Sequence, residues 1–210
     1  MIKNVFLDFN GTIINDVKLC YDLLNDLLKE QNKEPITLQR YKEIFTFPIK
    51  KYYELAGVDF NIESFDSLAV KFINRYQPLS LNCGLYPDVI EVLNYLKNKN
   101  INLFILSASE KDNLLWQCQK YKIDQYFNAI LGIDNIHAGS KVEIAKNFIK
   151  ENNINLDESI LIGDTLHDYE VAQAVGIDCR LVESGHQSRS VLAKANVKIY
   201  KNLIDIMEEL

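Results

Sequence analysis

The 210-residue sequence lacks three features that would place it in a special class of protein. It has no apolar run near the roughly 20 residues that a membrane-spanning helix needs. It has no basic stripe, and its net charge of −6 disfavours nucleic acid as a partner. Its N-terminus enters a short strand-like run directly, without the pattern of a signal peptide. We therefore expect a cytoplasmic protein that binds neither membranes nor nucleic acids.

Cysteine is sparse and scattered. Cys20, Cys83, Cys118 and Cys179 form no CxxC pair, and no histidine stands near them at the spacing of metal ligands. This pattern favours free thiols in a reducing compartment. Repeats and low-complexity segments are absent too. With 48% hydrophobic and 25% charged residues, the chain is long enough for one core, or for one core and a small inserted module.

Short apolar runs alternate with helical patterns over most of the chain. The runs suit strands buried on both faces, and they are 5–7, 101–106, 129–131, 160–162, 180–182 and 197–200. Between them, Pro87 suits a first helical position. Ser140 and Glu143 fit a capping box, and Gly176 fits a helix C-cap. This alternation predicts an α/β fold with a doubly wound parallel sheet.

Residues 15–82 break the pattern, because they contain no convincing strand. Pro48, Gly57 and Pro78 punctuate this stretch. Its predicted helical segments are 19–28, 38–45, 52–56 and 65–76. We therefore divide the chain into an α/β core, residues 1–14 and 83–210, and an inserted helical module, residues 15–82. The module should lie above the carboxyl end of the first strand.

Polar side chains follow three of the predicted strands, at the edge where parallel sheets bind ligands. Asp8 follows the first strand, Ser107 the second and Asp164 the fourth. Asp8 and Asp164 can share Mg²⁺, which prefers oxygen ligands. Asp168 can support the waters of that ion or pair with Lys141, which opens a helix and offers a positive charge to phosphate. A carboxylate in this setting can attack phosphorus and form an aspartyl-phosphate.

Four stretches of the sequence, taken in order, resemble the motifs of the haloacid dehalogenase (HAD) superfamily of hydrolases. The stretches are Asp8-Phe9-Asn10-Gly11-Thr12 (family pattern DxDGT), Leu106-Ser107-Ala108-Ser109, Lys141, and Gly163-Asp164-Thr165-Leu166-His167-Asp168. The helical module resembles the small cap of the phosphoglycolate phosphatase-like group. The resemblance covers nearly the whole chain and implies a Rossmann-like core with a helical cap.

The resemblance also implies a role for each matching residue. Asp8 is the expected nucleophile, and Asn10 and Lys141 are the other expected catalytic residues. The residues expected to hold the phosphoryl group are Thr12, Ser107, Ala108 and Lys141. The residues expected to hold a Mg²⁺ cofactor are Asp8, Asn10 (through its backbone carbonyl), Asp164 and Asp168. The implied substrate is a small phosphorylated metabolite, and the oligomeric state stays open.

Asn10 departs from the family pattern, which has a second acid at this position. In the phosphatases of the family that acid protonates the leaving group and then activates water, and an amide has no proton to return. Such assistance is worth about 10²–10⁴-fold. The departure therefore bears on turnover more than on fold or metal binding.

Several functions remain open because of Asn10. The first is a phosphatase that is slow or that uses good leaving groups, such as acyl phosphates, aryl phosphates or anhydrides. The second is hydrolysis of a phosphonate or a carbon–halogen bond. The third is a non-catalytic module that binds a phosphometabolite or a protein partner. In addition, Asn10-Gly11 is a dipeptide prone to deamidation, which would convert the amide into an acid.

Other polar and aromatic residues have plainer interpretations beside the functional ones. Ser107 also fits a helix N-cap for a segment starting near Ser109, and Asp168 fits a first-turn acid. The residues favoured as packing, loop or solvent-exposed positions without a chemical role are Trp116 (packing), His137 (loop), His167 (partly exposed), and Lys50 and Lys51 (solvated).

Overall fold

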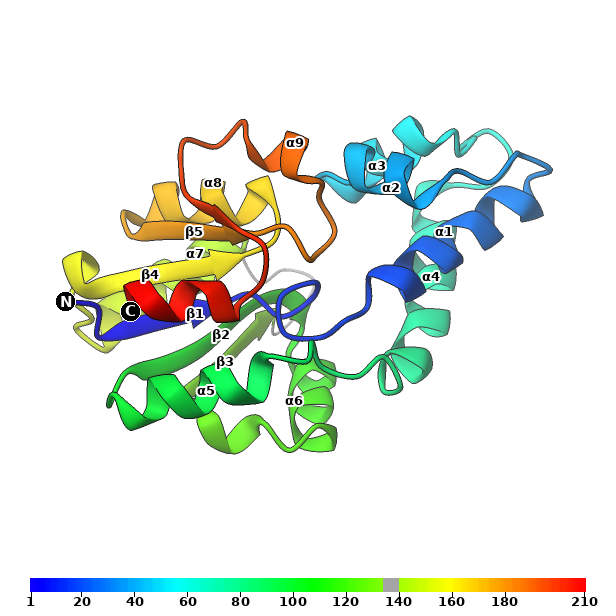
Figure 1. The fold of residues 1–210 in the computed structure, drawn as a ribbon. Coiled ribbons are helices and arrows are strands. Elements are labelled where there is room, and N and C mark those ends of the chain that lie inside the picture. Colours follow the sequence, from blue (N-terminus) through cyan, green and yellow to red (C-terminus); the bar gives the residue numbers. More distant parts are fainter. Residues whose placement is uncertain (134–139) are drawn as a thin grey trace.

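A six-stranded parallel sheet forms the centre of the protein, as the computed structural model of residues 1–133 and 140–210 shows (Figure 1). The strand order is β3-β2-β1-β4-β5-β6, and every pairing is parallel. The strands are β1 (Asn4–Leu7), β2 (Asn102–Glu110), β3 (Ala129–Ile133), β4 (Ser159–Gly163), β5 (Asp178–Val182) and β6 (Ile199–Tyr200). The strand order reverses between β1 and β4, which confirms the doubly wound sheet and places the binding crevice there.

Helices cover both faces of the sheet, which is why the strands are apolar nearly throughout. Val5 and Leu7 of β1 pack on one face and Phe6 on the other. The first face carries α5 (Val89–Asn98), α6 (Lys111–Lys120) and the 3₁₀ helix η3 (Ile204–Glu209). The second carries α7 (Lys141–Glu151), α8 (Leu166–Val175) and α9 (Arg189–Leu192). Two further 3₁₀ turns are η1 (Asp124–Tyr126) and η2 (Leu156–Glu158).

The segment between β1 and α5 is helical, as its lack of strand signals predicts. Its helices are α1 (Val17–Glu30), α2 (Leu38–Ile44), α3 (Ile49–Ala56) and α4 (Phe65–Ser80). They share a hydrophobic cluster of their own and lie at the end of the sheet opposite the two chain termini (Figure 1). The two connections to the core run together, because the N–H of Asn15 donates to the carbonyl of Gly84 at 3.0 Å. The division at 14/15 and 82/83 stays a prediction.

Local helix signals were mostly reliable. Ser140 and Glu143 form the predicted capping box at the start of α7, and Gly176 ends α8 with a left-handed φ of 88°. Pro87 was placed wrongly: it lies in a turn, and α5 begins at Val89. Pro78 does not interrupt α4 but stands in its last turn, where the missing N–H costs one hydrogen bond near a helix end.

The end of β2 also differs from expectation. Ser107 does not cap a helix, because β2 continues to Glu110, whose carboxylate accepts from the N–H groups of Asp112 and Asn113 and caps α6. Trp116 is not a packing residue: its side chain is 52% exposed, since α6 buries the face of Leu114 instead. No helix in the described ranges is long and apolar enough to span a membrane.

Candidate active site

Lys141 is the centre of a buried charge cluster at the carboxyl edge of the sheet. Its Nζ lies 2.6 Å from Oδ1 of Asp8, which follows β1, and 2.5 Å from Oδ1 of Asp168 in the first turn of α8. All three side chains are buried. The capping box of α7 fixes the helix start at Lys141, so the ammonium group has a defined place beside both carboxylates.

Each charge in this cluster shifts the pKa of its neighbours. Burial opposes the charged form of Lys141, but the carboxylates of Asp168 and Asp8 outweigh burial and raise the pKa of the ammonium group. Burial would raise the pKa of Asp168, but the charge and hydrogen bond of Lys141 and the hydrogen bond from Thr165 lower it. For Asp8, burial prevails over the attraction of Lys141, and the pKa is raised well above its usual range.

Asp164 adds a third carboxylate directly after β4. Oδ2 of Asp164 accepts from the backbone N–H of His186 at 2.6 Å, and Oδ1 accepts from the hydroxyl of Thr12 at 3.3 Å. Burial raises the pKa of Asp164 to about 6. Oxygen atoms of Asp8, Asp164 and Asp168 lie within 4.8 Å of one another. When all three carboxylates are ionised, Lys141 alone does not balance their charge, and hard divalent cations prefer such a set of oxygen ligands.

Gly11 lets the backbone approach this cluster. Its φ is 74°, and a Cβ atom at this position would overlap the carboxylate of Asp164 and the ring of His186. The glycine of the DxDGT-like stretch is therefore required both by its conformation and by the space that Asp164 occupies.

The side chain of Asn10 is held by three groups. Its Nδ2 donates to Oδ2 of Asp16 at 2.8 Å and to the hydroxyl of Tyr76 at 2.6 Å, and its Oδ1 accepts from the hydroxyl of Ser109 at 2.9 Å. Tyr76 belongs to α4, so this amide connects the helical module to the core. The backbone N–H of Gly11, which would attack in a deamidation, donates to Asp16 at 2.9 Å.

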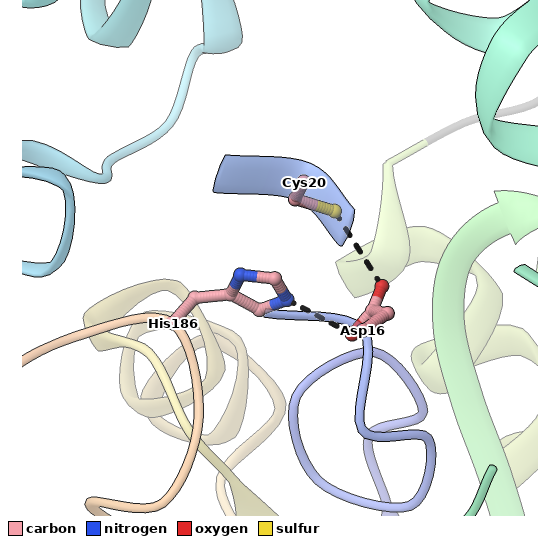
Figure 2. A group of neighbouring side chains, drawn as sticks. All are labelled: Asp16, Cys20 and His186. Carbon is pink, nitrogen blue, oxygen red and sulfur yellow. Dashed lines mark hydrogen bonds and ion pairs between the residues drawn. The ribbon is translucent and has the colours of Figure 1, made fainter. Parts of the chain in front are cut away.

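A second cluster, formed by Asp16, Cys20 and His186, lies beside Asn10 (Figure 2). Nε2 of His186 is 3.2 Å from Oδ1 of Asp16, and Sγ of Cys20 is 3.7 Å from Oδ2. Burial opposes both charges, yet their mutual attraction raises the pKa of His186 and lowers that of Asp16. Burial and the nearby Asp16 raise the pKa of the Cys20 thiol, so the sulfur stays protonated.

The atoms of this second cluster lie close enough to be considered as a metal site, but they already bond one another. Asp16 also accepts from the hydroxyl of Tyr76 at 2.7 Å, and Nδ1 of His186 is 2.7 Å from the hydroxyl of Tyr41. Cys20 lies on α1, Tyr41 on α2 and His186 in the loop after β5. The cluster therefore joins the helical module to the core through satisfied hydrogen bonds.

Asp16 and His186 were not identified from the sequence. Asp16 follows Asp8 by eight residues in the same loop, and that proximity to the first motif was the available signal. His186 has no local signal, because its partner Asp16 lies 170 residues away and only the fold brings them together.

The remaining predicted site residues lie around a cavity that adjoins the charge cluster. Ser107 is buried and its hydroxyl accepts from the N–H of Ser109 at 3.0 Å, while Ala108 is exposed. Ser107 and Ala108 line the cavity. Thr12 is not among the lining residues, and its hydroxyl donates to Asp164 instead. His167 is half-buried, as expected, and stacks on Phe47 with ring centroids 4.5 Å apart.

Lys50 and Lys51 are not among the residues that line the site. Lys50 and Lys51 are exposed, as expected for a solvated face. His137 lies outside the described residues.

The cavity has a volume of about 610 Å³ and extends from the charge cluster into the helical module. Asp8, Lys141 and Asp164 lie at its core end. A small charged group can thus sit against the carboxylates and Lys141 while the rest of a ligand extends between core and helices.

Comparison with known proteins identifies the family. A family model described as haloacid dehalogenase-like hydrolase matches residues 5–182. The chain belongs to this family. Phosphoglycolate phosphatase 1 of Pseudomonas aeruginosa is 20% identical over 97% of this chain and 78% of its own length.

Solved structures of haloacid dehalogenase-like proteins have the same fold as this chain. A haloacid dehalogenase-like family hydrolase from Streptococcus pneumoniae has a TM-score of 0.81 at 18% identity, and the match covers 99% of this chain and 98% of that one. A chain from Bacteroides fragilis has a TM-score of 0.84 at 19% identity, over 98% of this chain and all of the other. At such identities these matches establish the fold, which confirms the α/β core with a helical cap.

The shared ammonium group gives a prediction for stability. Lys141→Met should lower the free energy of unfolding by about 3–5 kcal/mol in the presence of a chelator, because it leaves two buried carboxylates without their partner. Urea denaturation followed by circular dichroism measures this. Lys146→Met, an exposed lysine on the same helix, should change stability by no more than about 0.5 kcal/mol. Equal effects of the two substitutions would contradict the proposed importance of the cluster.

Proposed function

We propose that the protein is a Mg²⁺-dependent phosphatase that forms an aspartyl-phosphate at Asp8 and acts on a small phosphorylated metabolite. The observation that carries this proposal is the position of Lys141 between Asp8 and Asp168, with Asp164 alongside, at the carboxyl edge of the sheet. Relatives named phosphoglycolate phosphatase support the same reaction class. The free state of all four cysteines fits a reducing compartment such as the cytoplasm.

The carboxylates of Asp8, Asp164 and Asp168, with the backbone carbonyl of Asn10, are the proposed Mg²⁺ ligands. When bound, the ion would supply positive charge that neutralises the phosphoryl oxygens and keeps the carboxylates ionised. Their oxygen chemistry and excess negative charge fit this ion. Thr12, which donates to Asp164, has an orienting role in this arrangement.

Each of the other site residues has its own role in the proposed reaction. Lys141 holds one oxygen of Asp8 and faces the phosphoryl group with its positive charge, while Ser107 and the backbone around Ala108 complete the cradle for the phosphoryl oxygens. Asp8 attacks phosphorus, and the leaving group departs as the bond to its oxygen breaks. Water then displaces the Asp8 carboxylate from phosphorus and releases phosphate. Positioning and electrostatics carry most of the work, as is usual in phosphoryl transfer.

Asn10 leaves this mechanism without a general acid for the leaving group. Its amide nitrogen donates to Asp16 and Tyr76 and its oxygen accepts from Ser109, so it holds the loop and the cap but transfers no proton. The proposed enzyme is therefore slow on esters that need a protonated leaving group. The same bonding favours, as a second candidate, a non-catalytic protein that binds a phosphometabolite or a partner in this cavity.

Phosphonate hydrolysis has less support. In the family it adds a Schiff-base lysine from the cap, and Lys50 and Lys51 are both exposed. Within the described residues, no cap lysine lines the cavity.

The nucleophile can be tested directly. Asp8→Asn keeps the shape of the side chain but removes the attacking charge, so hydrolysis of acetyl phosphate should fall by at least about 10³-fold. The phosphorylated protein that mass spectrometry detects after acid quenching of the wild type should be lost as well. Asp22→Asn, on α1 with a side chain that is 47% exposed, is the matched control. Unchanged hydrolysis in Asp8→Asn would contradict the assignment.

The missing acid can be restored. Asn10→Asp should raise kcat for alkyl phosphates by about 10²–10⁴-fold, because the leaving alkoxide then receives a proton. The gain for acetyl phosphate should be small, since its leaving group needs no proton. Steady-state assays with Mg²⁺ on both substrates measure the contrast. Tight binding of phosphate esters with no turnover in either protein would support the non-catalytic candidate instead.

A further inference from the structure

The cap half of the cavity is apolar and aromatic. Its walls include Phe45, Tyr52, Phe65, Phe72 and Ile73. Phe72 stacks on Tyr76, with ring centroids 5.8 Å apart and the planes inclined by 12°. Because the Tyr76 hydroxyl bonds Asn10 at 2.6 Å, this aromatic wall reaches the residue that replaces the acid of the family pattern. The part of a substrate beyond its phosphoryl group therefore meets flat hydrocarbon surface.

Among the described residues, the same cavity offers no lysine or arginine that is free to bind a second anionic group. Among its described lining residues Lys141 is the only lysine or arginine, and it is engaged by Asp8 and Asp168. His186 is engaged by Asp16. Glu110 adds a negative charge to the wall. A substrate carboxylate, such as that of phosphoglycolate, would thus find no free lysine or arginine among these described lining residues, and a buried charge without an oppositely charged partner is costly.

Asn10 restricts the leaving group further. Without a proton donor at this position, the leaving oxygen departs as an anion. A phenol, like the tyrosine side chain, has a pKa of about 10. An alkyl alcohol resembles water, whose pKa is about 15.7. An aryl oxide therefore leaves without protonation far more readily than an alkoxide, and its ring matches the aromatic wall.

We propose that the natural substrate is an aryl phosphate monoester whose aromatic group carries no charge. This inference rests on the proposed phosphatase function and adds the substrate class. An oxygen of Asp8 bonds to phosphorus as the bond from phosphorus to the aryl oxygen breaks. The aryl oxide leaves with the electron pair and takes a proton from solvent. Water then bonds to phosphorus, releases the Asp8 carboxylate, and loses its proton to solvent, giving inorganic phosphate.

The test compares kcat/KM of the wild type for phenyl phosphate, 2-naphthyl phosphate, phosphoglycolate and acetyl phosphate. The two aryl oxides are similar in basicity, so the second ring should raise kcat/KM about tenfold through apolar contact alone. The kcat/KM for phosphoglycolate should be at least about 100-fold lower than that for phenyl phosphate, because its leaving alkoxide needs a proton. Acetyl phosphate reports whether the phosphatase reaction occurs at all.

A pair of variants on α4 checks that the cap provides this contact. Ile73 lines the cavity and is 46% exposed, whereas Val70, three residues earlier, is 61% exposed and is not among the lining residues. Ile73→Ser should lower the ratio of 2-naphthyl to phenyl activity about fivefold, and Val70→Ser should leave the ratio unchanged.

Two results would overturn the inference while the phosphatase proposal stands. The first is a kcat/KM for 2-naphthyl phosphate close to that for phenyl phosphate. The second is a kcat/KM for phosphoglycolate as high as for the aryl esters. Either result counts when the protein hydrolyses acetyl phosphate. Absence of hydrolysis of all four compounds would refute the phosphatase proposal, and this inference with it.

Discussion

A single ammonium group shared by two buried carboxylates is the interaction on which the site depends. Lys141 holds Asp8 from the end of β1 and Asp168 from the start of α8, so it connects three separate segments of the core. Burying one positive charge beside three carboxylates is unfavourable unless further positive charge is present. The proposed divalent cation would supply this charge and would offset the negative charge of an incoming phosphoryl group, and the carboxyl edge of the sheet brings the three carboxylates together.

The helical cap is tied to this centre by polar contacts at several points. Tyr76 bonds Asn10 and Asp16, and Tyr41 bonds His186. The side chain of Gln187 donates to the carbonyl of Phe45 at 2.7 Å. These bonds lie close to Asp8, and they fix the amide of Asn10. An opening of the cap would have to break them, which would couple access to the cavity to the geometry around Asn10.

Much of this arrangement follows from the sequence. The positions of Asp8, Lys141 and Asp164 at strand and helix ends could be predicted because parallel strands bring their carboxyl ends to one edge. Helix ends such as Ser140 and Gly176 could be predicted for a different reason, because the capping signals lie within a few residues of each end.

The features that escaped prediction depend on contacts between distant segments. The pair of Asp16 and His186 joins residues 170 positions apart, and the aromatic wall draws side chains from α3, from α4 and from Phe45 directly after α2. Predictions made from the type of a single residue were wrong where the packing of the helix determined its position. Trp116 is large and apolar, yet the helix buries its other face. Pro78 sits where a helix end tolerates it.

Urea unfolding at increasing Mg²⁺ concentration tests whether the buried carboxylates form one cation-binding centre. Because the ion would bind the native state only, the unfolding midpoint of the wild type should rise with the logarithm of Mg²⁺ concentration. Asp164→Asn should abolish this rise. A wild-type midpoint that does not respond to Mg²⁺, or an equal rise in Asp164→Asn, would contradict the account.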